Sequence, residues 1–346
     1  VLFLRPSATF PLWRYVPLPV SGGVCLAEEV FSAKRERLMF MYPQSNSARS
    51  VRDLSGVWDF RFNANEPWQP IAVPASYNDQ SPDPEFRRHY GMAYYRTTFT
   101  VPEGARRVLR FDAVTHNAVV RLNGQEIASH RGGFLPFEAD ITALAQPGET
   151  VTLDVEVDNR IGHSSLPVGN EGGTAFFGSD NAGIPAVEAG KARQQAQGIN
   201  LPNFDFFNYA GITRPVHLYT TPAAYIRDVT VAADMTGTLR YTVDTVGEGS
   251  VKVEILDAED RIVACADGAA GTVQVENARL WQPRPGTPYL YTALVRFGKD
   301  EYRQKFGFRS VEVSGHKFLI NGAPFISRAP ASMRTRPSVA AAMMPV

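Results

Sequence analysis

Short runs of alternating apolar and polar residues, separated by turn residues, dominate the chain from residue 41 to about residue 313. A period of two is typical of antiparallel strands that bury one face. In the run 56–62 the alternation places three aromatic side chains on one face: Trp58, Phe60 and Phe62. The same pattern predicts strands at 94–101, 107–114, 118–122 and 151–157. We therefore predict a β-sandwich with an aromatic core.

The connections between these runs are of two kinds. Asn123-Gly124 lies between two alternating runs, and it predicts a hairpin because both central residues of a type I′ turn need a positive φ. From residue 162 to residue 204 the alternation gives way to Gly, Ser and Asn, and only 185–197 indicates a helix. A loop of this length in a compact domain is usually functional or mobile. We assign residues 41–221 to this first domain.

A second group of strands follows Pro222. The alternation predicts them at 226–232, 239–246, 251–256, 261–265, 272–275, 289–297 and 302–313. About seven short strands is the number found in an immunoglobulin-like sandwich, although the Cys-Trp-Cys hallmark is absent. We assign residues 222–313 to this domain. Asn321-Gly322 predicts a further hairpin within 314–326, which we interpret as the start of a third domain because its apolar residues need a covering.

Both ends of the chain depart from the strand pattern. Prolines and arginines cut the apolar pieces of residues 1–40 well short of a membrane span or the core of a signal peptide, so we expect a disordered lead. Residues 327–346 combine Arg, Pro and Ala with no acidic residue, a composition that cannot bury a face. We expect a disordered tail there. Our hypothesis is that it is read out of frame.

Charge and cysteine content exclude several classes of protein. The 346 residues contain 35 basic and 35 acidic side chains, so we expect neither a nucleic-acid nor a membrane partner. Cys25 and Cys265 match no metal or redox spacing, which favours a reducing, cytoplasmic location. No histidine pair has metal spacing, and Gly132-Gly133 lacks the strand-to-helix context of a nucleotide loop. We expect no metal and no cofactor.

Six segments occur in the order known from one enzyme family: LRFDAVTH (109–116), GGFLPFEADIT (132–142), DFFNYAGITRPVHLYTTP (205–222), LWQP (280–283), FGFRSVEV (306–313) and FLINGAPF (318–325). Through them the chain resembles, from about residue 42 to residue 325, the non-catalytic front half of family 2 glycoside hydrolases, most closely the β-glucuronidases. The resemblance implies an all-β fold here: a jelly-roll, galactose-binding-like sandwich followed by an immunoglobulin-like sandwich. Only the first hairpin of a (β/α)8 barrel would follow.

The resemblance also implies a function for the whole enzyme. Such enzymes hydrolyse β-linked glucuronides by a retaining mechanism, in which two carboxyl groups about 5–5.5 Å apart act as acid/base and nucleophile. Both glutamates belong to the barrel in this family, so the resemblance implies no catalytic residue in this chain and no activity of the chain alone. The expected partner is a glucuronide substrate. Relatives are commonly tetramers, which implies a homo-oligomer for the complete enzyme.

Three residues are candidates for the rim of the substrate pocket: Asn203, Asp205 and Asn208. In the family this stretch faces the barrel, where these side chains could supply hydrogen bonds to sugar hydroxyls. The alternative interpretation is that Asp205 caps a turn and that its aromatic neighbours fill a domain contact. Asn170-Glu171 imitates the pair that carries the acid/base in the family, but it lies in a polar loop, and we interpret it as solvated.

Other residues admit a structural and a functional interpretation. His116 and His217 stand in strand sequences, and we expect them to be hydrogen-bonded in the core or in turns. Five aromatic residues could stack on sugars, but their placement favours the core: Trp58, Phe60, Phe111, Phe134 and Phe137. Three alternatives remain for the protein as a whole. It could be a non-enzymatic carbohydrate-binding protein, an immunoglobulin-type interaction protein, or the scaffold of a related β-galactosidase or β-mannosidase.

Overall fold

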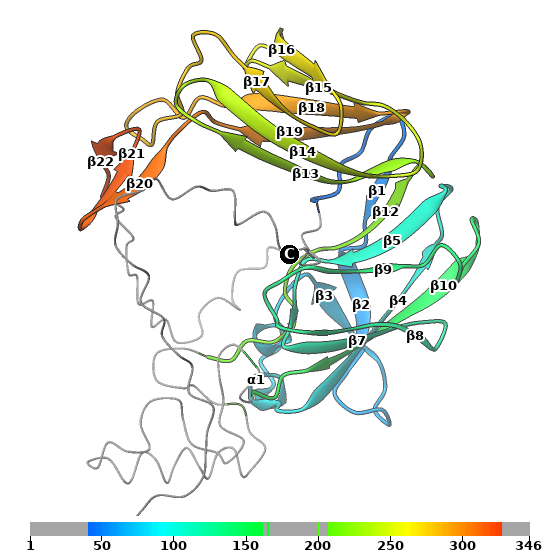
Figure 1. Cartoon of the computed structure of the whole chain (residues 1–346). Helices are drawn as coiled ribbons and strands as arrows, with labels where there is room; N and C mark the ends of the chain where they lie inside the picture. Colours follow the sequence, from blue (N-terminus) through cyan, green and yellow to red (C-terminus); the bar gives the residue numbers. More distant parts are fainter. Residues whose placement is uncertain (1–40, 162–164, 166–199, 201–206, 327–346) are drawn as a thin grey trace, which may run out of the picture. The chain divides into compact units, whose positions relative to one another are not determined.

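The computed structural model describes residues 41–161, 165, 200 and 207–326, and within these ranges nearly all regular structure is β-strand (Figure 1). Two separate hydrophobic cores form, one from residues before Thr221 and one from residues after Ala224. The predicted all-β class with two successive sandwiches is confirmed.

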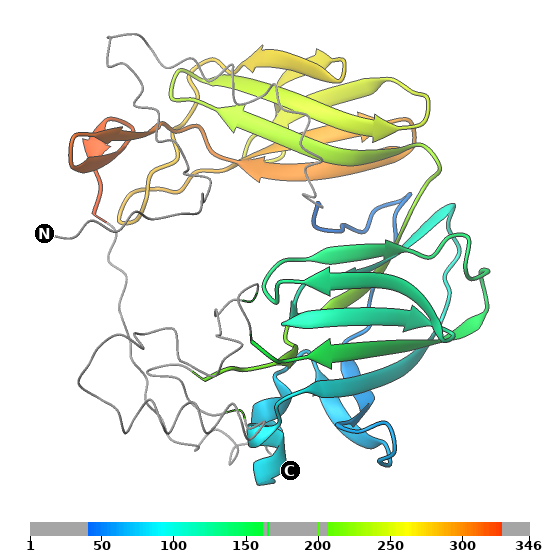
Figure 2. The same ribbon diagram turned by 60° about the horizontal axis from the view of Figure 1, so that its bottom comes forward.

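The first sandwich consists of two antiparallel sheets. The four-stranded sheet has the order β1 (Val51–Asp53), β12 (Val216–Thr221), β5 (Arg106–Phe111) and β9 (Phe137–Asp140). The six-stranded sheet has the order β3 (Gln69–Val73), β2 (Gly56–Arg61), β4 (Met92–Thr100), β10 (Thr150–Asp158), β7 (Asn117–Leu122) and β8 (Gln125–Arg131). Strands of this sheet lie side by side in Figure 2. Two short strands, β6 (Val114–Thr115) and β11 (Gly211–Ile212), form a separate two-stranded sheet in the same domain.

The core of the first sandwich is aromatic, as the alternation predicts. Trp58, Phe60 and Phe62 are at most 6 % exposed, and the Phe60 ring lies 4.9 Å from that of Tyr95. Phe134 differs, because it is 51 % exposed. It follows Gly132, whose φ of 108° ends the alternation of β8, so its expected place in the core was wrong.

Local turn chemistry is mostly as predicted. Asn123 and Gly124 have φ values of 49° and 83°, which confirms the hairpin between β7 and β8. The sequence pattern missed two short helical turns, η2 (Tyr77–Asp79) and α1 (Pro84–Arg88). The signal for α1 was nevertheless present, because Asp83 accepts a hydrogen bond from the Glu85 amide and Pro84 occupies the first turn.

The second sandwich also has two sheets. One has the order β13 (Tyr225–Ala233), β14 (Thr238–Val246) and β17 (Ala270–Gln274). The other has the order β16 (Ile262–Asp267), β15 (Val251–Leu256), β18 (Tyr291–Phe297) and β19 (Asp300–Phe306). Its core packs buried aliphatic residues such as Leu239 and Val253 against Phe297 and Phe308.

The predicted strand 302–313 is divided in the structure. It forms β19 and, after an interruption, β20 (Val311–Ser314). At the interruption, Gly307 packs so closely on Trp281 that a Cβ atom would lie 2.6 Å from the Trp281 Cβ. The strand therefore leaves its sheet where only glycine fits.

A small third sheet follows, formed by β20, β21 (Lys317–Ile320) and β22 (Ala323–Pro324). Asn321 and Gly322 have φ values of 52° and 74°, so the predicted hairpin is confirmed. Val313 and Phe318 are cross-strand partners, 76 % and 42 % exposed, and they lie on one face of this sheet. Ile320, the partner of Val311 on the same face, is only 9 % exposed, so this face is covered at that end and open at Val313 and Phe318.

A buried ion pair connects the segment before β1 with the second sandwich. The Arg49 guanidinium donates to both carboxylate oxygens of Asp300, at 2.7 and 2.6 Å. The Ile226 amide donates to the same carboxylate at 2.7 Å. The two charged side chains are 4 % and 0 % exposed, so the pair is fully desolvated.

Candidate functional site

Buried asparagines gather where the chain leaves β10 and where it returns to β11. Asn159 directly follows β10, while Asn200 and Asn208 precede β11, and all three are at most 5 % exposed. The Asn208 amide donates to the Asn159 carbonyl at 3.0 Å, and the Asn200 amide donates to the Asn208 carbonyl at 2.9 Å. The departing and returning ends of the segment 160–207 are therefore held together by side chains.

His116 completes this contact from the start of β7. Its Nε2 meets the Asn208 Oδ1, and the imidazole is 1 % exposed. Because the Asn208 amide nitrogen donates elsewhere, its oxygen must accept, which assigns the imidazole proton to Nε2. The expectation that His116 is a hydrogen-bonded core residue is confirmed.

The same cluster is tied to the chain around α1. The Asn159 side-chain amide donates to the His89 carbonyl at 2.8 Å and accepts from the Gly91 backbone amide at 2.7 Å. Asn78 of η2 acts in the same way, since its side chain donates to the Phe86 carbonyl and accepts from the Ala210 amide, both at 2.9 Å. These side chains satisfy backbone groups that the short strands leave unpaired.

Two buried phenols lie near the cluster. Burial raises the pKa of Tyr77 well above its ordinary value, and burial likewise raises the pKa of Tyr95. Both phenols therefore stay protonated beside the neutral amides. The amides and phenols of this arrangement can hold the backbone in place through hydrogen bonds.

The structure places only one of the predicted rim residues. Asn208 is buried, and both ends of its amide are engaged within the chain, so it holds the returning segment. Asn203 and Asp205 lie outside the described residues, as do Asn170 and Glu171. The rim role of Asn203, Asp205 and Asn208 stays a prediction.

A more exposed group lies next to Asn208. The rings of Phe207 and Tyr209 meet edge to face with centroids 4.9 Å apart, and the Arg87 guanidinium lies 4.2 Å above Phe207. Arg87 also pairs with Asp79 at 2.5 Å. Tyr209 is 42 % exposed, so this group presents an aromatic surface and the Arg87–Asp79 ion pair beside the asparagine cluster.

The remaining candidates have structural roles. His217 is buried, with Nε2 3.4 Å from the Asp112 carboxylate and 3.3 Å from the Tyr42 hydroxyl, so it is a hydrogen-bonded core residue as predicted. Across the ranges that the structure describes, no three His, Cys, Asp or Glu side chains gather as a metal site would require.

Two models of one family match consecutive stretches of the chain. The model "Glycosyl hydrolases family 2, sugar binding domain" matches residues 51–222, and the model "Glycosyl hydrolases family 2" matches residues 217–309. These ranges fall on the first and the second sandwich. The chain therefore belongs to family 2 of the glycosyl hydrolases.

The similar proteins within this family are β-glucuronidases. The solved β-glucuronidase of Faecalibacterium prausnitzii is 54 % identical with a TM-score of 0.74, and the match covers 82 % of this chain and 50 % of that one. The Bifidobacterium dentium β-glucuronidase, solved with coumarin-3-O-glucuronide, is 46 % identical with a TM-score of 0.72, covering 83 % and 52 %. The Paenibacillus borealis β-glucuronidase is 37 % identical over 82 % of this chain. The chain spans about half the length of the curated relatives it matches.

The sequence pattern found Asn208 but missed the residues that hold it. Asn159 directly follows β10, and Asn78 lies in a turn. Both residues stand outside the alternating runs, so the alternation does not single them out. A polar amide directly after a buried strand is the one available signal, since the amide can replace the next ladder hydrogen bond. Nothing in the spacing connects Asn159 to Asn208, 49 residues later.

Proposed function

We propose that this chain supplies the two non-catalytic sandwiches of a β-glucuronidase. The observation that carries the proposal is the 54 % identity over 82 % of the chain to the Faecalibacterium prausnitzii enzyme, together with the two consecutive family matches. The relatives named above are all β-glucuronidases, which favours a glucuronide over a galactoside or mannoside.

The catalytic step would belong to a barrel domain. Retaining glycosidases need two carboxyl groups on rigid neighbours, and the family places both on the barrel. The chain alone would accordingly not turn over a glucuronide. Cytoplasmic location and homo-oligomeric assembly belong to the same proposal. Within the described residues no helix has the length and apolarity needed to cross a membrane.

The first sandwich would also contribute to the rim of the substrate pocket. Asn203 and Asp205 stand between Asn200 and Asn208, two buried residues that are hydrogen-bonded to each other. The buried cluster thus holds Asn200 and Asn208, which flank the stretch. A side chain that binds a substrate needs such a rigid support. Asp205 would accept hydrogen bonds from sugar hydroxyls.

A chimera tests the scaffold role. Residues 41–326 of this chain replace the matching half of the Faecalibacterium prausnitzii enzyme, and hydrolysis of an aryl glucuronide is measured for the chimera, for the unmodified enzyme and for this chain alone. We expect the chimera to hydrolyse the glucuronide and this chain to release no product. A folded chimera without activity contradicts the scaffold role, and multiple turnovers by the purified chain contradict the absence of catalysis.

Asp205→Ala in the active chimera tests the rim role. Losing one charge-assisted hydrogen bond to a hydroxyl should lower kcat/KM about tenfold or more. The matched control is Asp244→Ala, an exposed carboxylate of the second sandwich. Equal kcat/KM for the Asp205→Ala chimera and the control refutes the rim role while leaving the scaffold role intact.

A further inference from the structure

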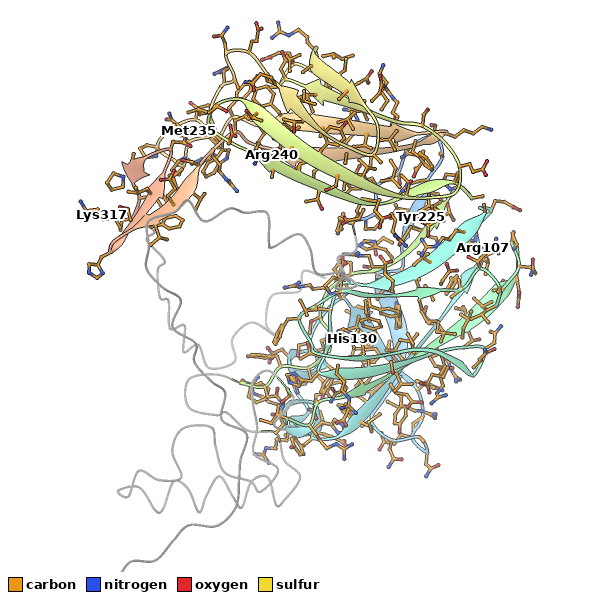
Figure 3. The ribbon with its side chains drawn as sticks, viewed as in Figure 1. Arg107, His130, Tyr225, Met235, Arg240 and Lys317 are labelled. Carbon is orange, nitrogen blue, oxygen red and sulfur yellow. The ribbon has the colours of Figure 1, made fainter. Side chains whose placement is uncertain are left out.

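A hollow of about 850 Å³ lies on the outer face of the six-stranded sheet and is lined by residues of β4, β10, β7 and β8. Figures 1 and 2 show these strands as neighbours in the sheet. We call it the sheet hollow. The lining residues that matter most are Met92, Asn117, Ser129, Arg131, Asp158 and Ile161. His130, labelled in Figure 3, lies on β8. The volume is within the range of about 300–1,000 Å³ that small-molecule sites occupy.

Strand register explains why polar side chains meet there. Met92 pairs with Asp158, Asp158 with Asn117, and Asn117 with Arg131, across four neighbouring strands. Directly paired residues of an antiparallel sheet point to the same side. The four side chains therefore form one row, about 14 Å long at the usual strand spacing. Glu156, Val119 and Ser129 form the next row in the same way.

The charged side chains around these rows differ in whether they form an ion pair. Asp158 pairs with Arg160 at 2.7 Å, and Glu156 pairs at 3.0 Å with Arg121, a guanidinium that Glu126 shares at 3.4 Å. Arg131 is exposed and has no carboxylate within ion-pair distance among the described residues. Burial lowers the pKa of His130, which leaves its imidazole neutral at pH 7. Arg131, at the β8 side, is therefore the arginine of the sheet hollow that has no ion-pair partner among the described residues.

The same sheet provides a contrast. Further along β4 and β10, Arg96 and Asp154 are cross-strand partners and close an ion pair at 2.6 Å. That region of the face is an ordinary solvated surface of paired charges. In the row that ends at Arg131, the guanidinium has no ion-pair partner among the described residues, and its cross-strand partner is the amide side chain of Asn117.

We propose that the sheet hollow binds an acidic saccharide, with its uronate carboxylate on Arg131. The Asn117 amide and the Ser129 hydroxyl lie in the rows beside that guanidinium and suit sugar hydroxyls, which both donate and accept hydrogen bonds. Met92 and Ile161 supply an apolar side against which the C–H face of a pyranose packs. An arginine fork is the side chain best matched to a carboxylate.

The site also adjoins the asparagine cluster in the chain. Asn117 follows His116, and Asp158 precedes Asn159, so consecutive side chains of β7 and β10 face opposite sides of the sheet. One set holds Asn208 and the other lines the sheet hollow. The proposal nevertheless needs no hydrolysis, and this chain alone is sufficient to test it.

The test is isothermal titration calorimetry of the whole chain with a hyaluronan tetrasaccharide, which alternates glucuronate and N-acetylglucosamine. The controls are the same tetrasaccharide with its carboxylates methyl-esterified, and inorganic sulfate. We expect saturable binding of the acidic tetrasaccharide and a loss of about tenfold or more on esterification, the usual contribution of a hydrogen bond between charged groups.

Variants localise the binding. Arg131→Gln should weaken the acidic tetrasaccharide about tenfold and leave the esterified one unchanged, whereas Asn117→Ala should weaken both. Arg240→Gln, an exposed arginine of β14, is the matched charge control and should change nothing (Figure 3). The proposal is overturned by absence of saturable binding, by equal losses in Arg131→Gln and Arg240→Gln, or by sulfate binding as tightly as the tetrasaccharide.

Discussion

His89 shows how a single buried side chain makes folding depend on pH. Its ring stacks on Phe62 at 4.1 Å, and its Nε2 donates to the Met92 carbonyl at 2.7 Å. Burial lowers the pKa of His89 below its ordinary value of 6.5, although the Met92 carbonyl favours the charged form. The folded chain therefore resists a proton that the unfolded chain accepts. Its contribution to stability is present above about pH 6.5 and is lost as pH falls through the lower folded pKa.

We predict that His89→Gln makes the free energy of unfolding less dependent on pH between about pH 7.5 and about pH 5. Denaturant titrations at several pH values measure this slope. His316→Gln, an exposed histidine in the turn between β20 and β21, is the control and should retain the slope of the parent chain. A slope that His89→Gln leaves unchanged assigns the acid sensitivity to other groups.

At the scale of elements, the third sheet has exposed apolar side chains on one face. Val313 and Phe318 oppose each other across β20 and β21, and Val311 adds to the same side at 53 % exposure. Contiguous exposed apolar side chains promote association, whereas single ones do not. The chain on its own should therefore associate through this sheet.

We predict that the double variant Val313→Thr, Phe318→Ser shifts the chain toward monomer in sedimentation velocity at high concentration. The free energy of unfolding should change by less than about 0.5 kcal/mol, since these side chains are exposed. Val57→Thr removes an isolated apolar side chain, 74 % exposed on β2, and should not affect association. If the double variant associates as strongly as the parent chain, association does not occur through the third sheet.

The strands could be predicted from sequence because their side chains report burial with a period of two. The run 56–62 shows this most clearly, since each inward position is an aromatic residue and each outward position is smaller or polar. What the pattern could not supply is pairing between distant residues. The interruption at Gly307 depends on Trp281, and the closure of the asparagine cluster depends on Asn159 and Asn208, which no local signal connects. Asn203 and Asp205 remain predictions for the same reason.

At the scale of the whole molecule, one carboxylate joins the segment before β1 to the second sandwich. Asp300 receives two hydrogen bonds from Arg49 and one from the Ile226 amide, with no solvent exposure. Removing one partner of such a pair leaves a buried charge without compensation, which costs about 3–5 kcal/mol. Exposed pairs contribute far less, because water already stabilises their charges.

We predict that Asp300→Ala lowers the free energy of unfolding by about 3–5 kcal/mol in denaturant titrations. Asp244→Ala breaks the exposed pair with Arg227 and should cost no more than about 1 kcal/mol. Similar losses of unfolding free energy in the two variants would show that the buried Arg49–Asp300 pair matters no more to stability than an exposed pair.

The Asp300 carboxylate also limits how the chain can be divided for study. A fragment cut at the family boundary, residues 51–222, omits Arg49, while the complementary piece 217–309 keeps Asp300 with only the Ile226 donor. The piece 217–309 therefore retains a buried carboxylate without its Arg49 partner, whereas 51–222 contains neither member of the pair. An expression boundary drawn from homology would thus create a defect in the second sandwich that the intact polypeptide does not have, and a fragment that contains Asp300 has to begin before residue 49.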